Sequence, residues 1–145
     1  MRLPRKVVRI LHGLQGSGKT TFARQIKQFL ENRGLVVRIH STDDFFTDDR
    51  GHYVYDRSKL SEYHKHNFEA FCESVENPSV DVIFVDNTNI EPWNWQQYQK
   101  FAEEHGAIVN HKYMIADIKT CFRYNIHGVP FCKLVHLYQR YPRRP

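Results

Sequence analysis

Residues 13–20 have the types and spacing of a phosphate-binding loop. They match the pattern G-x-x-x-x-G-K-[ST] at every fixed position. Glycines allow successive backbone N–H groups to turn towards phosphate oxygens, and the helix that follows adds its positive N-terminal dipole. Lys19 is expected to reach the β- and γ-phosphates, and Thr20 to offer its hydroxyl group to Mg²⁺. The residues expected to bind the nucleotide are Gly13, Gln15, Gly16, Ser17, Gly18, Lys19, Thr20 and Thr21.

A second set of reactive groups stands where other strand-like runs end. Asp43 and Asp44 follow the run LVVRIH closely, and Asp86 closes the apolar run VIFV. A carboxylate at such a place can accept the proton of a hydroxyl group, with Asp43 preferred over Asp44 for this role. Asp86 is expected to hold a magnesium-bound water. The polar residues after it are candidates for binding the acceptor or the loop backbone: Asn87, Thr88 and Asn89.

Strand-like and helix-like segments alternate along the chain. β-rich runs are predicted for residues 6–12, 35–40, 80–85 and 107–116. Helices are predicted for 58–76, 92–105, 117–126 and 130–141, and for 19–33, with Phe22, Ile26, Phe29 and Leu30 on its apolar side. The polar stretch 41–57 is predicted to be a loop.

Strict alternation predicts a single α/β domain over residues 1–145. Its sheet should be mostly parallel and covered by helices on both faces. Ligands of such sheets bind beyond the carboxyl ends of the strands. This rule brings four separate stretches of the sequence into one site: residues 13–20, 41–46, 86–89 and 123–128.

Charge is distributed unevenly along the 145 residues, whose net charge is +5. Residues 1–40 contain nine Lys or Arg residues and one acid, residues 41–105 contain five and fourteen, and residues 106–145 contain seven and one. Two basic ends around an acidic middle suit an anionic ligand held between them. An ordinary solubilising surface is the alternative interpretation.

Composition narrows the class of protein. A content of 41% hydrophobic and 14% aromatic residues is typical of a folded domain, and no apolar run is long enough to cross a membrane. The three cysteines are odd in number and lack metal-ligand spacing, so we expect reduced thiols in the cytoplasm or nucleus. They are Cys72, Cys121 and Cys132.

Four stretches together resemble one known family: GLQGSGKTTFARQI, STDDFF, VIFVDNTN and RYNIHGVP. They are similar to phosphate-loop domains of the polynucleotide 5′-hydroxyl kinase type, most of all to its animal ubiquitin-ligase-binding-protein branch. The kinase-like half of cyclic-nucleotide phosphodiesterase is a more distant relative. The resemblance runs from about residue 8 to about residue 138. It implies the three-layer sandwich of phosphate-loop proteins, closed by a helical lid.

The resemblance also implies roles for individual residues. Lys19 and Thr20 match the phosphate and metal residues of the family, and Asp43 matches its general base. Residues 86–89 match a stretch on the acceptor side. Arg123 matches an arginine of the lid that covers the donor phosphates.

Two positions depart from the phage-type members of this family. Phe46 stands near the place of an arginine that follows the aspartate pair, and His127 near the place of a second lid arginine. Fewer cationic groups weaken the grip on an acceptor phosphate and the stabilisation of transition-state charge. A different acceptor or a reduced activity therefore stays open.

These observations predict an ATP-dependent phosphotransferase that uses Mg²⁺ and acts on a hydroxyl group, above all the 5′-hydroxyl of RNA, DNA or a nucleotide. The absence of an N-K-x-D motif argues against an ordinary GTPase, although GTP stays open as a donor. One alternative is a small-metabolite kinase with the same donor site. Another is a catalytically weak nucleotide-binding interaction module. Neither membrane association nor a particular protein partner is predicted.

Overall fold

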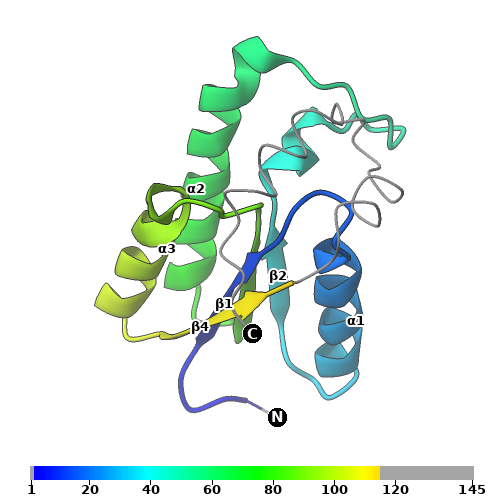
Figure 1. Ribbon diagram of the computed structural model, residues 1–145. Helices are drawn as coiled ribbons and strands as arrows, with labels where there is room; N and C mark the ends of the chain where they lie inside the picture. The colour runs from blue at the N-terminus through cyan, green and yellow to red at the C-terminus, as the bar shows by residue number, and fades with distance from the viewer. Residues whose placement is uncertain (1, 115–145) are drawn as a thin grey trace.

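The computed structural model of the chain describes residues 2–114, in which strands and helices alternate as the sequence predicts (Figure 1). The strands are β1 (Val7–His12), β2 (Val37–His40), β3 (Val82–Asp86) and β4 (Ile108–Tyr113). The longer helices are α1 (Lys19–Glu31), α2 (Leu60–Glu76) and α3 (Pro92–Glu104). The predicted helices 117–126 and 130–141, with the expected lid, lie outside the described residues.

One parallel sheet organises this part of the chain. Its strand order over the described residues is β2-β3-β1-β4, and each neighbouring pair is parallel. The register places Val8 of β1 between Ile83 of β3 and Val109 of β4. Because parallel strands share their direction, the carboxyl ends of all four strands meet at one edge of the sheet.

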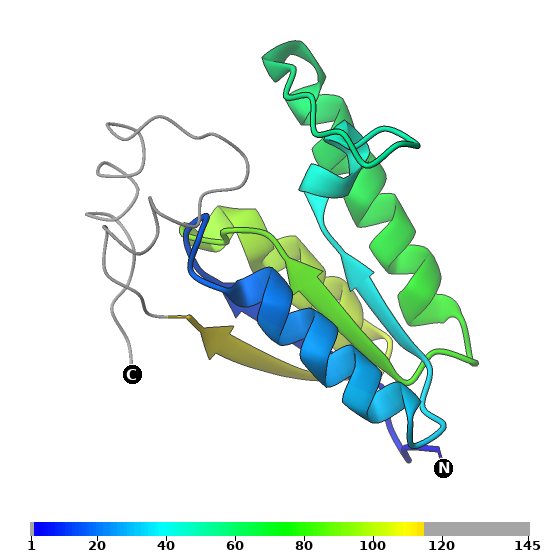
Figure 2. The same ribbon diagram turned by 90° about the vertical axis from the view of Figure 1, so that its right-hand side faces the viewer.

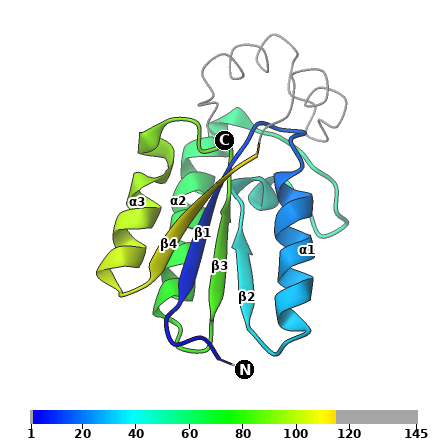
Figure 3. The ribbon, with the colours of Figure 1, turned by 60° about the horizontal axis from the view of Figure 1, so that its bottom comes forward.

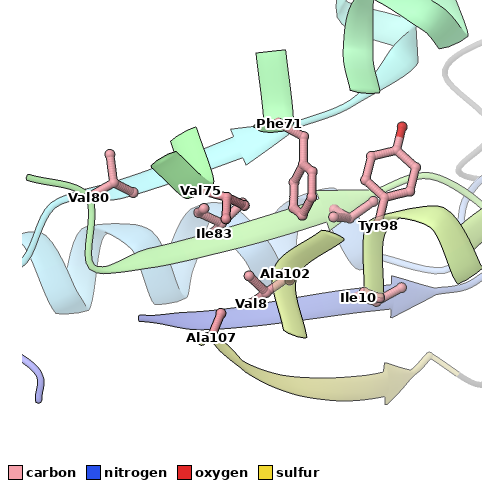
Figure 4. Close-up of a cluster of buried hydrophobic side chains, with 10 residues drawn as sticks. Val8, Ile10, Phe71, Val75, Val80, Ile83, Tyr98, Ala102 and Ala107 are labelled. Carbon is pink, nitrogen blue, oxygen red and sulfur yellow. The ribbon is translucent and has the colours of Figure 1, made fainter. Parts of the chain in front are cut away.

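Helices cover both faces of the sheet, which gives three layers (Figures 2 and 3). On one face, Ala23 of α1 packs with Leu11 and Phe84 of the strands. On the other face, Phe71 of α2 and Tyr98 of α3 form the larger core with residues of β1 and β3 (Figure 4). Among the described residues, no helix has both the length and the apolar content needed to span a bilayer.

One expected core residue of α1 lies at the surface. Phe29 is 51% exposed, although Phe22, Ile26 and Leu30 pack against the core as predicted. The Arg33 guanidinium lies 3.6 Å from the centre of the Phe29 ring. The ring is therefore covered by a cation–π contact and does not pack against the sheet.

The stretch 41–57, expected to be a loop, contains ordered turns. Residues Thr42–Phe46 form a short 3₁₀ helix, η1, and a tight hairpin follows in which Thr47 pairs with Tyr53. The Phe46 ring is only 5% exposed and packs edge-on against Tyr63 of α2, with the ring centroids 4.7 Å apart. A single buried aromatic side chain therefore anchors a segment that has no regular apolar pattern. Phe46 lies in this packed cluster and presents no polar group to a ligand.

Candidate active site

The phosphate-loop motif connects the carboxyl end of β1 to the start of α1. A β-carbon on Gly13 would lie 2.5 Å from Ser17 Oγ and 3.0 Å from Met114 Cβ, so this position has no room for a side chain. Gly18, which precedes α1, has a φ angle of 90°, a conformation that favours glycine. Close packing therefore explains the first glycine of the motif, and backbone conformation explains the last.

Polar atoms without partners gather in the same loop. Gln15 Oε1 and Ser17 Oγ are buried and form no hydrogen bond with the residues that the structure describes. Buried polar atoms are normally paired, so such atoms beside the N-terminus of a helix indicate a place for a polar ligand. The dipole of α1 favours an anion there.

Lys19, Thr20 and Asp86 form a compact cluster at the start of α1. Thr20 Oγ1 donates a hydrogen bond of 2.7 Å to Asp86 Oδ2, and Lys19 Nζ lies 3.4 Å from Asp86 Oδ1. Lys19 is 8% exposed and Asp86 is 1% exposed, so the ion pair is buried. Asp86 Oδ1 accepts no hydrogen bond within residues 2–114. A hydroxyl oxygen beside a carboxylate oxygen with spare acceptor capacity fits the ligand preference of Mg²⁺.

Asp43 stands in η1, directly beyond the carboxyl end of β2. Its carboxylate is hydrogen-bonded to the side chain of Tyr53 from the hairpin. Burial and the nearby charge of Asp43 raise the pKa of Tyr53 to about 12, so the phenol keeps its proton and acts as the donor. Burial also lowers the pKa of His64, whose Nδ1 lies 3.2 Å from Thr42 Oγ1.

One cavity of about 1010 Å³ lies between the start of α1 and the segment that contains η1 and the hairpin. Thr20 and Asp86 line it from the donor side, and Asp43 and Asp44 line it from η1. The structure therefore brings together residues that the sequence assigned separately to metal binding and to proton transfer. Tyr53 and His52 from the hairpin line the same cavity.

Three cations that sequence analysis did not single out line this cavity too. Arg24 and Lys27 come from α1, and Arg38 comes from β2. We call these three residues the basic wall. A signal was present in the sequence, since Arg24 and Lys27 follow Thr20 at the helical spacing of four and seven residues.

The residues after β3 support the site more than they line it. Asn87 Oδ1 accepts a hydrogen bond from the Thr42 backbone N–H at 3.0 Å, which ties β3 to η1. The Thr88 carbonyl accepts one from the Gly13 N–H at 3.1 Å. Asn89 is 1% exposed and its amide donates to the Leu11 carbonyl at 2.6 Å. Asn89 therefore bonds to the backbone of β1 just before the phosphate loop, and contact of these residues with the acceptor stays a prediction.

Two neighbouring histidines, the buried His12 and the half-buried His111, lie behind the phosphate loop. His12, which is 0% exposed, donates from Nδ1 to the Asn89 carbonyl at 2.8 Å, and its Nε2 lies 2.7 Å from His111 Nδ1. Burial lowers the pKa of His12 to about 4 and also lowers the pKa of His111. The pair joins β1 to β4 as neutral groups, a connection that sequence spacing did not indicate.

Other expected site residues are placed as follows. Thr21 is exposed at the third position of α1, outside the cluster around Asp86. Arg123 and His127 lie outside the described residues, so the lid arginine stays a prediction.

A family model described as an AAA domain (AAA_33) matches residues 8–127. The chain belongs to this family. NEDD4-binding protein 2 from Homo sapiens is 30% identical over 145 residues, a match that covers 94% of the chain and 8% of that protein. The chain spans 10% or less of the length of the curated relatives it matches first, which include the YLP motif-containing protein 1 of rat, mouse and human.

Solved structures share the fold. Kti12 from Chaetomium thermophilum, in complex with ADP-AlF3, has a TM-score of 0.68 at 17% identity and covers 95% of this chain and 81% of its own. The APS kinase CysC from Mycobacterium tuberculosis, in complex with AMPPNP and APS, has a TM-score of 0.65 at 15% identity, with coverages of 88% and 72%. The predicted three-layer α/β fold is confirmed, and it is the fold of phosphate-loop kinases.

Proposed function

We propose that this chain transfers the γ-phosphoryl group of ATP to a hydroxyl group, with the 5′-hydroxyl of a polynucleotide or nucleotide as the acceptor. The observation that carries this proposal is the shared cavity, in which Thr20 and Asp86 face the same space as Asp43. The nucleotides in the complexes of similar fold, AMPPNP and ADP-AlF3, support ATP as the donor. The resemblance in residues 41–46 and 86–89 supports the 5′-hydroxyl acceptor.

Each side chain has a defined task in this reaction. The loop N–H groups and Lys19 bind the β- and γ-phosphates, and Mg²⁺ held by Thr20 and Asp86 supplies positive charge beside them. Lys19 Nζ lies 3.4 Å from Asp86 Oδ1; with nucleotide and metal bound, the ammonium group would pair with phosphate and the Asp86 carboxylate would hold the metal. Arg123 is assigned to cover the donor phosphates on the resemblance alone.

Proton and bond changes balance around Asp43. The acceptor oxygen forms a bond to the γ-phosphorus while the bond from that phosphorus to the β–γ bridging oxygen breaks. ADP leaves, and the hydroxyl proton passes to the Asp43 carboxylate. Tyr53, held in its neutral form, keeps that carboxylate oriented towards the cavity.

The test is a transfer assay with labelled ATP and a panel of 5′-hydroxyl RNA, 5′-hydroxyl DNA, nucleosides and small polyols. Lys19→Ala should abolish transfer, and Asp43→Asn should keep ATP binding while transfer falls at least about 100-fold. The matched controls are Lys100→Ala on α3 and Asp49→Asn in the hairpin, which should retain activity. Full activity of Asp43→Asn would exclude Asp43 as the base.

Two other outcomes would redirect the assignment. Transfer to polyols but not to 5′-hydroxyl groups would make the chain a small-metabolite kinase. Tight ATP binding without transfer to any acceptor would make it an interaction module, a reading that the name of NEDD4-binding protein 2 favours.

Cys72 is a free thiol whose pKa burial raises to about 11, and we propose a reducing location, the cytoplasm or the nucleus.

A further inference from the structure

Tyr98 of α3 places its ring in the apolar core and its hydroxyl group in a polar network. The residue is 1% exposed, and its ring packs edge-on against Phe71 and Phe68 of α2, with centroid distances of 4.9 Å and 5.2 Å. Figure 4 shows the hydroxyl oxygen pointing away from β1. A phenylalanine ring would fill the same core position, so packing alone does not account for the hydroxyl group.

Two asparagine side chains bond to this hydroxyl group. Asn67 of α2, also 1% exposed, donates from Nδ2 to Tyr98 Oη at 3.1 Å. The side chain of Asn87, directly after β3, is hydrogen-bonded to the same phenol. Burial raises the pKa of Tyr98, and both hydrogen bonds act in the opposite direction, as donors to the phenol oxygen do. The phenol oxygen is therefore an acceptor at which α2, α3 and the end of β3 meet.

Asn87 connects this buried phenol to η1. Its Oδ1 accepts a hydrogen bond from the Thr42 backbone N–H at 3.0 Å. The carbonyl end of the Asn87 amide is thus engaged with η1, and its nitrogen end donates to Tyr98. Because both ends of one planar amide are held, the orientation of the Asn87 side chain is fixed.

Thr42 lies one residue before Asp43, the proposed base. Thr42 is 4% exposed, and its Oγ1 lies 3.2 Å from Nδ1 of His64, which stands one helical turn before Asn67 in α2. The backbone of Thr42 is therefore held by Asn87, and its side chain by His64. Since consecutive Cα atoms keep a fixed separation of about 3.8 Å, a shift of Thr42 displaces Asp43 as well.

We propose that Tyr98 is a positioning residue for phosphoryl transfer. Its hydroxyl group orients Asn87, which holds the backbone of Thr42. The Asp43 carboxylate, on the next residue, is thereby kept in the cavity. This inference rests on the proposed function and deepens it with a residue that is not among the described residues lining the cavity. A general base must stay within hydrogen-bond reach of the hydroxyl, and a misplacement of about 1 Å can cost about 100-fold in rate.

The first test is Tyr98→Phe, which removes one oxygen atom and keeps the ring in the core. With ATP and the most active acceptor of the panel, kcat should fall about tenfold. The KM for ATP should stay constant, because no residue of the phosphate loop belongs to the network. Ile83→Val is the matched control, since it loses a methylene group from the same core, away from the network, and should keep kcat. Unchanged kcat in Tyr98→Phe, or an equal fall in Ile83→Val, would overturn the inference.

A double-mutant cycle tests whether Tyr98 acts through Asn87. In the background of Asn87→Ala, adding Tyr98→Phe should change kcat less than about twofold, because the connection to η1 is already broken. A fall of about tenfold that persists in this background would show a merely structural role and would overturn the inference.

Asn67→Leu is a second variant, which removes one of the two donors and leaves the phenol in place. It should lower kcat about threefold, and it takes over both tests if Tyr98→Phe does not fold. Unchanged kcat in Asn67→Leu would then overturn the inference.

Amide hydrogen exchange, followed by NMR, separates this inference from the proposed function. The Thr42 N–H should exchange at least about tenfold faster in Tyr98→Phe than in the wild type. The Ile108 N–H, which bonds to the Lys6 carbonyl at 2.9 Å, should exchange at the same rate in both. No transfer to any acceptor by the wild-type chain would overturn the proposed function. In that case faster exchange at Thr42 still supports Tyr98 as the residue that positions η1, and unchanged exchange overturns it.

Discussion

Thr20 Oγ1 and Asp86 Oδ2 lie 2.7 Å apart, although the two residues are separated by 66 positions in the sequence. This hydrogen bond joins the first turn of α1 to the carboxyl end of β3. It holds a hydroxyl oxygen and a carboxylate next to each other. The Lys19 ammonium group, 3.4 Å from the other carboxylate oxygen, completes the cluster.

Replacing Asp86 should affect the magnesium requirement first. Asp86→Asn keeps the shape of the side chain but removes the charge that attracts the metal. The apparent affinity for Mg²⁺ should fall about 10–100-fold, and transfer at limiting Mg²⁺ should fall with it. ATP binding without Mg²⁺ should persist, because Lys19 loses a competing partner. An unchanged Mg²⁺ titration curve would place the metal elsewhere.

The donor half of the site could be predicted because its requirements are local. A backbone that wraps a phosphate needs glycine at fixed positions. A side chain does not fit at Gly13, and Gly18 has a positive φ. The alternation of strands and helices then fixed the edge at which Asp43 and Asp86 meet.

The remaining parts depend on packing that spacing does not record. Helical spacing places Arg24 and Lys27 on the same face as Thr20, but the hairpin residues that line the other side of the cavity depend on tertiary packing. The polar composition of residues 41–57 predicts a loop, yet the Phe46 ring packs against Tyr63 of α2 and so fixes η1 against that helix. A polar residue is expected after a strand such as β3, and Asn89 fits that pattern. Its φ of 52° and its hydrogen bond to the Leu11 carbonyl could not be predicted from the pattern.

Tyr53 should position the base without acting as one. Tyr53→Phe removes the hydrogen bond to the Asp43 carboxylate, and kcat should fall about tenfold while the KM for ATP stays constant. Because the pKa of Tyr53 is raised to about 12, the wild-type pH–rate profile should show no loss from this phenol up to about pH 10. Tyr63→Phe, which removes a hydroxyl from the neighbouring aromatic cluster, is the control and should keep kcat. Equal kcat for Tyr53→Phe and wild type would contradict the role.

Asn89 should contribute to stability by two separable effects. Its amide satisfies the Leu11 carbonyl, and asparagine tolerates the positive φ of 52° better than alanine does. Asn89→Ala loses both and should lower the free energy of unfolding by about 2–4 kcal/mol. Asn89→Gly loses only the hydrogen bond and should be less destabilised than Asn89→Ala by about 1 kcal/mol. Urea unfolding of both variants measures the difference, and equal stability of the two would remove backbone strain from the explanation.

Two histidines should make the fold sensitive to mild acid. Burial lowers the pKa of His12 to about 4, and burial with the nearby Arg38 lowers the pKa of His40 to about 4, whereas both pKa values are near 6.5 in an unfolded chain. Between pH 6.5 and pH 4 the unfolded state therefore binds more protons than the native state. The stabilisation is fully present above pH 6.5 and is lost as the pH falls towards 4, by about 3 kcal/mol for each of the two histidines.

Urea unfolding at a series of pH values between 7 and 4 measures this loss. His40→Gln keeps a polar group near Ser74 Oγ, which lies 2.7 Å from His40 Nε2, but cannot take up a proton. Its free energy of unfolding should decline less steeply with acid than that of the wild type. His105→Gln changes an exposed histidine at the end of α3 and should leave the slope as it is. The opposite result would be a wild-type free energy of unfolding that stays level from pH 6.5 to pH 4.5. It would mean that the two imidazoles are protonated as readily in the native state as in the unfolded chain.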